Sequence, residues 1–341
     1  MGRDGTGVRR ARGCVFAAAL MFMAAGAYGQ FLIGGYGLQV GAGLQFSTVT
    51  MEETVFTASG SDQKDSFLAY EAPLQTGARF SARVEPYDRY RGIGFSLAGS
   101  YTCYLPSNTG SMKDEDWEKG KRFSVSEHDL SLLSFQEAGA VAQCFIPFVG
   151  RVAVGAGAAV YWNRTAAAVR NGWIQGVTPG MLLTGNEPKK YFTGVVSEYF
   201  QEWVWVVPAA SVWFRLGNHE LGAQAEFWGK AWGNHLDYHF LRQYAYEDSV
   251  THKEIYLDDS YTLYRDEVAG DGVFAVEVLW KYRLNAHMAW EMRVGWQRVL
   301  GARGDTAVAA QGMDKMEIKE ADMAGGAFKK FNFSVGVNVW I

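Results

Sequence analysis

The chain ends with the stretch FNFSVGVNVWI, residues 331–341, in which apolar side chains alternate with small, polar or aromatic ones up to the last position. Alternate side chains of a strand point to opposite sides, so this stretch predicts a strand with one apolar face. The same period of two recurs along residues 32–46, 78–85, 93–103, 152–162, 204–216, 221–230, 274–284 and 288–297, and less regularly along 128–146. The sequence therefore predicts about ten strands.

The connections between these strands alternate in length. Long ones cover residues 47–76, 106–123, 164–202, 233–272 and 301–327, and short ones cover 86–92, 147–150, 217–220 and 284–287. Short turns on one side and long loops on the other are typical of outer-membrane barrels, whereas a soluble sandwich has no reason to separate them. We expect an all-β fold, a ten-stranded antiparallel transmembrane outer-membrane β-barrel with short periplasmic turns and long extracellular loops.

Charged residues on the second face of the strands fit a polar barrel interior. Unpaired charges would be costly in the dry core of a sandwich, so we expect these residues to be paired inside the barrel. They are Arg79, Arg83, Glu277, Lys281, Glu291 and Arg293. In residues 221–230 the alternation also places Gln224, Glu226, Trp228 and Lys230 together on that face.

The composition excludes other membrane and non-globular classes. The chain is 48% hydrophobic and has only 7 Pro among 341 residues, which excludes a disordered protein. After residue 30 no run approaches the roughly 18 to 20 consecutive apolar residues of a membrane-spanning helix, which excludes a polytopic helical protein.

The N-terminus has the features of a secretory signal peptide. Arg3, Arg9, Arg10 and Arg12 precede an apolar run from Cys14 to Ala25, and Ala27-Tyr28-Gly29 offers a cleavage site. We predict that residues 1–29 are removed and that residues 30–341 form a single β-barrel domain. Cleavage removes four basic residues and one acidic residue, so 28 basic and 35 acidic residues leave a net charge of −7. So acidic a chain is a poor nucleic-acid binder.

Only Cys103 and Cys144 remain after that cleavage. They are too few for a disulfide scaffold, and they read as small apolar strand residues that could form one bridge in an oxidising compartment.

Two stretches in the expected long loops carry candidate catalytic groups. Residues 111–118 read SMKDEDWE and contain Asp114 and Asp116, and residues 234–239 read NHLDYH and contain Asp237 and His239. An Asp two residues from a His lies on the same face of an extended segment and can orient the imidazole as a general base. The second and fourth long loops rise from opposite walls of a ten-stranded ring, so the two pairs could hold a water between them.

These two stretches resemble the motifs of the omptin family, outer-membrane aspartate/histidine proteases built as ten-stranded barrels. Met112 to Trp117 is similar to that family's Met-x-Asp-x-Asp-Trp motif, and Asp237 to His239 is similar to its Asp-x-His motif. The resemblance implies an aspartic-type endopeptidase in which His239 is the general base and Asp237 its orienting partner. Asp114 and Asp116 would position the water and stabilise the oxyanion.

The resemblance also implies a substrate pocket. Glu53 is similar to the family's glutamate at the base of a pocket for a basic side chain. Where omptins that cut at basic residues have an aspartate, this chain has His235, so the pocket would lose one carboxylate. We expect substrate binding by Glu53 and His235, with the preference for Arg or Lys left open.

The expected partners are peptides or proteins at the cell surface and outer-membrane lipid, with the chain a monomer of the cell outer membrane and its active loops extracellular. We expect no metal and no cofactor, and leave a lipid or glycolipid requirement open. Three alternatives remain open: zinc held by His235, Asp237 and His239, a non-catalytic barrel that binds ligands as an adhesin, and a narrow passive pore.

Overall fold

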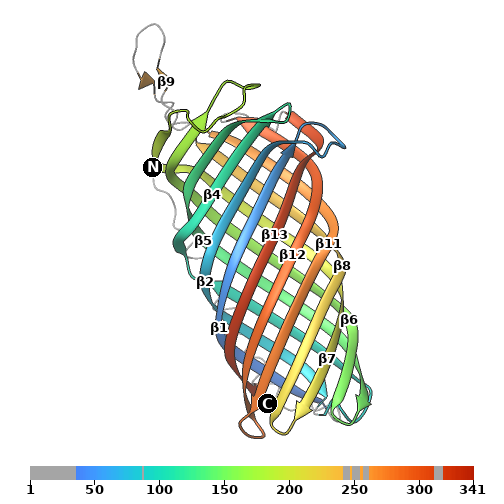
Figure 1. The fold of residues 1–341 in the computed structure, drawn as a ribbon. Helices are drawn as coiled ribbons and strands as arrows, with labels where there is room; N and C mark the ends of the chain where they lie inside the picture. Colours follow the sequence, from blue (N-terminus) through green and yellow to red (C-terminus); the bar gives the residue numbers. More distant parts are fainter. Residues whose placement is uncertain (1–35, 87, 241–245, 248–253, 256–260, 311–317) are drawn as a thin grey trace.

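Antiparallel strands close into a tilted barrel in the computed structural model, which describes residues 36–86, 88–240, 246–247, 254–255, 261–310 and 318–341 (Figure 1). The predicted signal peptide, residues 1–29, and the start of the predicted domain at residue 30 lie outside the described residues. The described part contains no helix that is long and apolar enough to cross a membrane. The strands are β1 (Tyr36–Phe56), β2 (Lys64–Pro86), β3 (Gly94–Tyr104), β4 (Ser107–Glu118), β5 (Lys121–Val149), β6 (Val152–Gly176), β7 (Lys190–Leu216), β8 (His219–Phe240), β11 (Tyr261–Arg283), β12 (Met288–Ala310) and β13 (Ile318–Trp340), with β9 (Tyr246–Glu247) and β10 (Glu254–Ile255) forming a separate ribbon.

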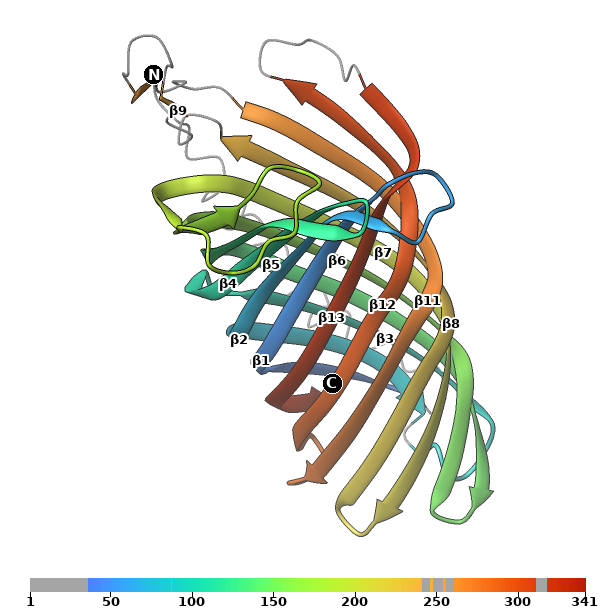
Figure 2. The ribbon, with the colours of Figure 1, turned by 45° about the horizontal axis from the view of Figure 1, so that its top comes forward.

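The eleven long strands occupy ten positions in the ring. β3 pairs with one half of β2 and β5, and β4 pairs with the other half of the same two strands, so β3 and β4 share one position. The C-terminal strand β13 pairs with β1 and closes the barrel. All strands run obliquely around it (Figure 2). The predicted all-β, ten-stranded outer-membrane barrel is confirmed.

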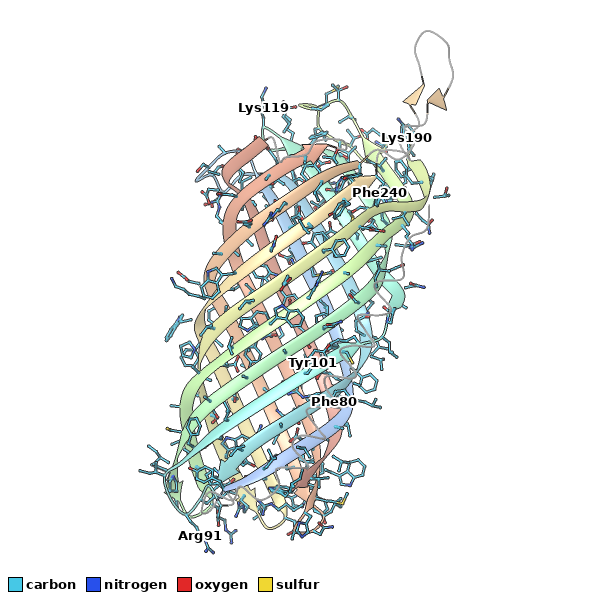
Figure 3. The ribbon with its side chains drawn as sticks, turned by 180° about the vertical axis from the view of Figure 1, so that it is seen from behind. Phe80, Arg91, Tyr101, Lys119, Lys190 and Phe240 are labelled. Carbon is cyan, nitrogen blue, oxygen red and sulfur yellow. The ribbon has the colours of Figure 1, made fainter. Side chains whose placement is uncertain are left out.

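The strands extend further than the alternation alone predicted. The first connection covers only residues 57–63 instead of 47–76, and the second only residues 119–120 instead of 106–123. In these segments β1 stays paired with β2, and β4 with β5, because the neighbouring strands are equally long. Apolar and polar side chains no longer alternate regularly there, so the sequence pattern does not mark them as strands. The candidate catalytic residues therefore lie on strands, near the end of the barrel marked by Lys119 and Phe240 in Figure 3.

The outer wall has a belt of exposed apolar side chains at the opposite end. On β8 exposed apolar side chains are found from Leu221 to Trp232, interrupted by Lys230, which pairs with Asp271 of β11 at 3.8 Å. These eleven steps correspond to about 26 Å of height at roughly 3.3 Å per residue and 45° tilt. That height matches the apolar thickness of an outer membrane. Beyond the belt the outer wall is polar, with Thr48, Asn234 and Lys329 exposed, so the upper part of the barrel projects above the lipid.

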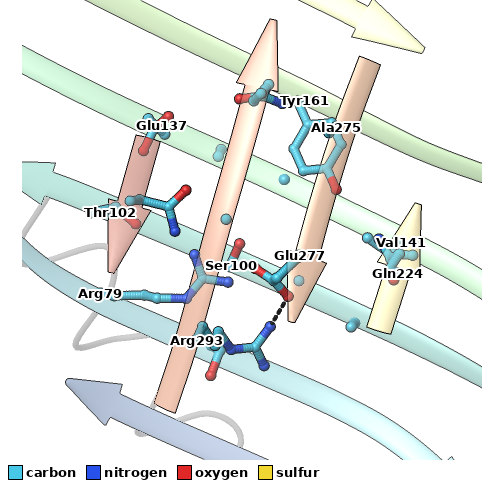
Figure 4. A pocket seen from close by; sticks show the side chains of 18 of the residues that line it. Arg79, Ser100, Thr102, Glu137, Val141, Tyr161, Gln224, Ala275, Glu277 and Arg293 are labelled. Atoms are coloured by element: carbon cyan, nitrogen blue, oxygen red, sulfur yellow. Dashed lines mark hydrogen bonds and ion pairs between the residues drawn. The ribbon is translucent and has the colours of Figure 1, made fainter. Parts of the chain in front are cut away.

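Ion pairs fill the interior at the height of the belt, as the sequence predicted. Arg293 Nη1 lies 2.6 Å from Glu277 Oε1, a contact drawn in Figure 4, and Arg293 also binds Glu291. Lys281 lies between Glu85 (3.7 Å) and Glu291 (3.9 Å). The polar interior encloses a cavity of about 110 Å³.

A row of contacting rings crosses the barrel above this polar interior. Tyr104 stacks on Phe135 at 4.5 Å, Phe135 contacts Phe328 at 6.4 Å, Phe328 contacts Trp205 at 6.2 Å, and Trp205 stacks on Tyr161 at 5.5 Å. These residues come from five different strands, and we call them the aromatic floor. The floor separates the ion-paired interior below from the candidate site above.

A β-bulge in β2 and another in β8 each add one residue to the strand. Even-numbered side chains face inward on one side of each bulge, and odd-numbered side chains face inward on the other side. Phe227 and Gly229 pair with the consecutive residues Phe274 and Val273 of β11, so Trp228 between them has no counterpart. Trp228 has a positive φ of 60° and is 76% exposed on the outer wall. The expectation that it lies on the same face as Glu226 is wrong, because the extra residue shifts the alternation by one.

Leu74 of β2 plays the same role, with a φ of 48° and an exposed side chain. Pro73 and Leu74 lie opposite Thr48 alone. Above these bulges, Tyr70 of β2 and the odd-numbered residues of β8 face inward.

The two cysteines are not joined to each other. Cys103 of β3 lies opposite Gln136 of β5, and Cys144 of β5 lies opposite Phe95 of β3, so the two thiols are at different heights of the barrel.

Candidate active site

Asp237 and His239 form a hydrogen-bonded pair on the inner face of β8. His239 Nε2 lies 2.7 Å from Asp237 Oδ2, and Asp237 is only 2% exposed. Ser197 Oγ donates to the other carboxylate oxygen at 2.5 Å, and Tyr70 Oη donates to Oδ2 at 3.3 Å. The carboxylate is thus held by three partners, while the imidazole, whose side chain is 30% exposed, is open to the interior space at this end of the barrel, which we call the groove.

Tyr70 brings the opposite wall of the barrel to this pair. Tyr70 lies on β2, pairs in register with Met112 of β4, and stacks on Tyr199 of β7 at 4.1 Å. Asp114 is two residues beyond Met112 and faces inward with Asp116, because the three residues share one side of β4. The two predicted pairs therefore face each other across the interior of the barrel.

Glu115, the third carboxylate of the acidic run, does not enter the groove. It pairs with Lys113 at 3.1 Å and with Arg122. Alternation along β4 explains this difference, since Glu115 lies between two inward-facing residues.

The charges of the groove alter the proton affinity of its members, all of which lie above the apolar belt. Burial raises the pKa of Asp114 to about 7, and the neighbouring Asp116 adds to the rise. Burial opposes a charge on His239, but the carboxylate of Asp237 outweighs it and, with Asp114 and Asp116, raises the imidazole pKa to about 9. The pKa of Asp114 thus lies near neutral pH and that of His239 about two units above it, so both groups can exchange protons with a substrate between these values.

A sequence model of the Omptin family matches residues 36–340 of the chain. The chain belongs to the omptin family. This family consists of outer-membrane proteases, so the recognition made from the two short motifs is confirmed. No curated protein sequence matches this omptin.

Solved structures give the same fold. The omptin superposes on the outer membrane protease OmpT of Escherichia coli with a TM-score of 0.70 and 16% identity, over 89% of this chain and 97% of the other. The toluene transporter TodX of P. putida matches with a TM-score of 0.28 and 9% identity, over 89% and 90% of the two chains. The latter match carries no argument beyond shared strand content.

The pocket residues Glu53 and His235 come together one layer below the catalytic pair. His235 precedes Asp237 by two residues and faces the same way, with Trp203 edge-on to its ring at 5.2 Å. Burial lowers the pKa of His235 to about 3, so the imidazole is neutral. Gly326 of β13 faces it so closely that a Cβ there would lie 2.3 Å from His235 Cε1.

A second carboxylate lies beside Glu53 and His235, because Asp266 of β11 is directly opposite His235 in the strand register. Burial raises the pKa of Glu53, and the nearby Asp266 charge raises it further. Sequence reasoning missed Asp266 because residues 233–272 were read as a loop. The bulge at residues 270–273 of β11 also breaks the alternation that would have placed Asp266 on the inner face.

Proposed function

We propose that this omptin is an endopeptidase that hydrolyses exposed peptides or proteins at the cell surface with a metal-free, activated water. The observation that carries the proposal is the Asp237–His239 hydrogen bond of 2.7 Å on one wall of a groove whose other wall presents Asp114 and Asp116. The groove lies above the apolar belt, where a soluble substrate can reach it.

In the proposed reaction, the water oxygen attacks the scissile carbonyl carbon while His239 takes the water proton. Asp237 keeps the ring oriented and stabilises the imidazolium that forms. Asp114 and Asp116 hold the water, and a proton on Asp114 hydrogen-bonds the oxyanion. His239 then returns its proton to the leaving amine as the C–N bond breaks, which restores the starting state.

The substrate would enter from the open end and place one side chain in the pocket of Glu53, His235 and Asp266. We further propose that residues 1–29 are a cleaved signal peptide, that the end carrying Lys119 and Phe240 is extracellular, and that the protein acts as a monomer in outer-membrane lipid.

The test is peptide hydrolysis by residues 30–341 refolded in detergent, with and without added lipid or glycolipid. A mixed peptide library should be cleaved by the wild type, and His239→Ala and Asp114→Ala should each lose activity. Glu71→Gln is a matched control, because Glu71 is exposed on the outer wall next to Tyr70. If the wild type cleaves nothing, or if the two variants cleave as fast as the wild type, the protease proposal fails and a non-catalytic ligand-binding barrel is favoured.

A chelator separates this mechanism from a metal-dependent one. We expect EDTA not to lower the rate, whereas inhibition that zinc reverses would assign the water to a metal ion. Swelling of liposomes that contain the protein would indicate a passive pore, and we expect none.

A further inference from the structure

Glu53, His235 and Asp266 form a compact cluster of metal-ligand side chains beneath the catalytic pair. One ligand atom from each residue lies within 4.8 Å of the other two. The three residues come from β1, β8 and β11, so the barrel closure itself brings them together. They are 4%, 1% and 2% exposed, respectively, which makes the cluster one of the most enclosed polar groups of the upper barrel.

The cluster leaves hydrogen-bonding capacity unused. Glu53 Oε2, His235 Nδ1 and Asp266 Oδ2 are all buried and have no hydrogen-bond partner among the described residues. Buried polar atoms nearly always have partners, and three orphans on neighbouring residues point to a missing ligand. No Lys or Arg in the described part of the chain forms an ion pair with either carboxylate.

We propose that Glu53, His235 and Asp266 bind a divalent cation of the zinc class. Carboxylate oxygens and an imidazole nitrogen are ligands that zinc accepts, and three protein ligands leave a fourth position that opens toward the groove. Ligand atoms around tetrahedral zinc lie about 3.4 Å apart, given bonds of roughly 2.1 Å, so small side-chain rotations suffice.

The surroundings of His235 suit a ligand role. With Nδ1 on the metal, Nε2 carries the proton and needs an acceptor. Gln201 Nε2 lies 3.3 Å from His235 Nε2, and Gln201 Oε1 is itself buried without a partner. Turning the Gln201 amide over would place this oxygen against the imidazole N–H and satisfy both groups.

This site goes beyond the proposed function, since neither Asp237 nor His239 is a ligand and the hydrolytic water is not metal-bound. The cation would lie at the base of the substrate pocket, in the place that a basic substrate side chain would otherwise take. Zinc and a guanidinium group would therefore exclude each other.

The test is calorimetric titration of chelator-treated, refolded protein with Zn²⁺ in detergent. We expect one equivalent to bind, His235→Gln and Asp266→Asn to weaken binding by at least about 100-fold, and the exposed-histidine control His287→Gln to bind as the wild type does. Cobalt absorption spectra of the same variants report the imidazole ligand directly, and Asp266→Asn keeps the test valid if His235→Gln does not fold.

Absence of zinc binding by the wild type, or unchanged binding by both variants, would overturn the proposal. So would binding of agmatine, a probe with a guanidinium group, that zinc does not displace. His239→Ala separates this site from the proposed hydrolysis, because that variant should lose cleavage and still bind one zinc.

Discussion

Replacing Asp237 with Asn should uncouple the imidazole of His239 from its charge partner while leaving the shape of the site intact. This carboxylate lies 2.7 Å from His239, and its negative charge raises the pKa of the imidazole although burial lowers it. A rise from 6.5 to about 9 corresponds to roughly 3 kcal/mol of net stabilisation of the imidazolium.

The Asp237→Asn variant lacks the negative charge that stabilises the imidazolium of His239, while the burial that disfavours the imidazolium is unchanged. We therefore expect the pKa of His239 to fall to its ordinary value of 6.5 or lower. The fraction of neutral imidazole at pH 7 would rise, yet kcat/KM should fall by about 10³-fold or more, because the ring loses its orienting acceptor and the charge that stabilises the imidazolium during attack.

The pKa can be followed by NMR titration of the histidine ring protons in detergent, with His239→Ala assigning the signal, and kcat/KM by peptide cleavage. Glu71→Gln removes a carboxylate from the outer wall and should change neither quantity. An imidazole pKa that stays near 9 in Asp237→Asn, or a kcat/KM within about tenfold of the wild type, would refute the assignment of Asp237 as the partner of the base.

Three further predictions follow from the same geometry. The pH profile of kcat/KM should be flat between limbs near 7 and 9, because the active form needs a protonated Asp114 and a neutral His239. Asp114→Asn should move the acid limb upward from about 7 toward the pKa of His239, which lies somewhat below 9 once the charge of Asp114 is gone, and an acid limb that stays at 7 would show that another group carries it. Deleting Trp228 should make Phe227 and Gly229 neighbours opposite Phe274 and Val273, which leaves the pairing above them unchanged and keeps Asp237 and His239 on the inner face. The variant should therefore form a heat-resistant barrel and still cleave, and loss of cleavage in a folded deletion variant would contradict the assignment of Trp228 as the extra residue of the bulge. Lys281→Met should remove the cation that Glu85 and Glu291 share, while Arg89 and Arg293 still neutralise these carboxylates. The free energy of unfolding, measured by urea titration in detergent, should fall by about 1–3 kcal/mol, and a midpoint equal to that of the wild type would contradict this.

The sequence alone predicts the barrel and the two candidate catalytic pairs, because both are visible in local spacing and short motifs. The alternation in residues 152–162 and 331–341 needs no tertiary information, and neither does the two-residue separation of Asp237 and His239. The strand ends are harder to predict, since the ladders above the belt are held by neighbouring strands while their side chains alternate imperfectly.

The pocket could not be completed from the sequence. Asp266 reaches it only through its register opposite His235, and that register depends on bulges in β8 and β11 that no local pattern marks. The positive φ at Trp228 is likewise unexpected for a large aromatic residue. Its energetic cost is offset by the strand pairing on both sides of the bulge, which the local sequence does not reveal.

The aromatic floor has a consequence for traffic through the membrane. Tyr104, Phe135, Phe328, Trp205 and Tyr161 lie across the barrel between the candidate site and its ion-paired lower interior. If the protein cleaves peptides as we propose, these rings stand in the way of fragments that would pass down through the barrel, and the products would leave by the end through which the substrate came. The proposed enzyme would then destroy a peptide at the cell surface without importing its pieces.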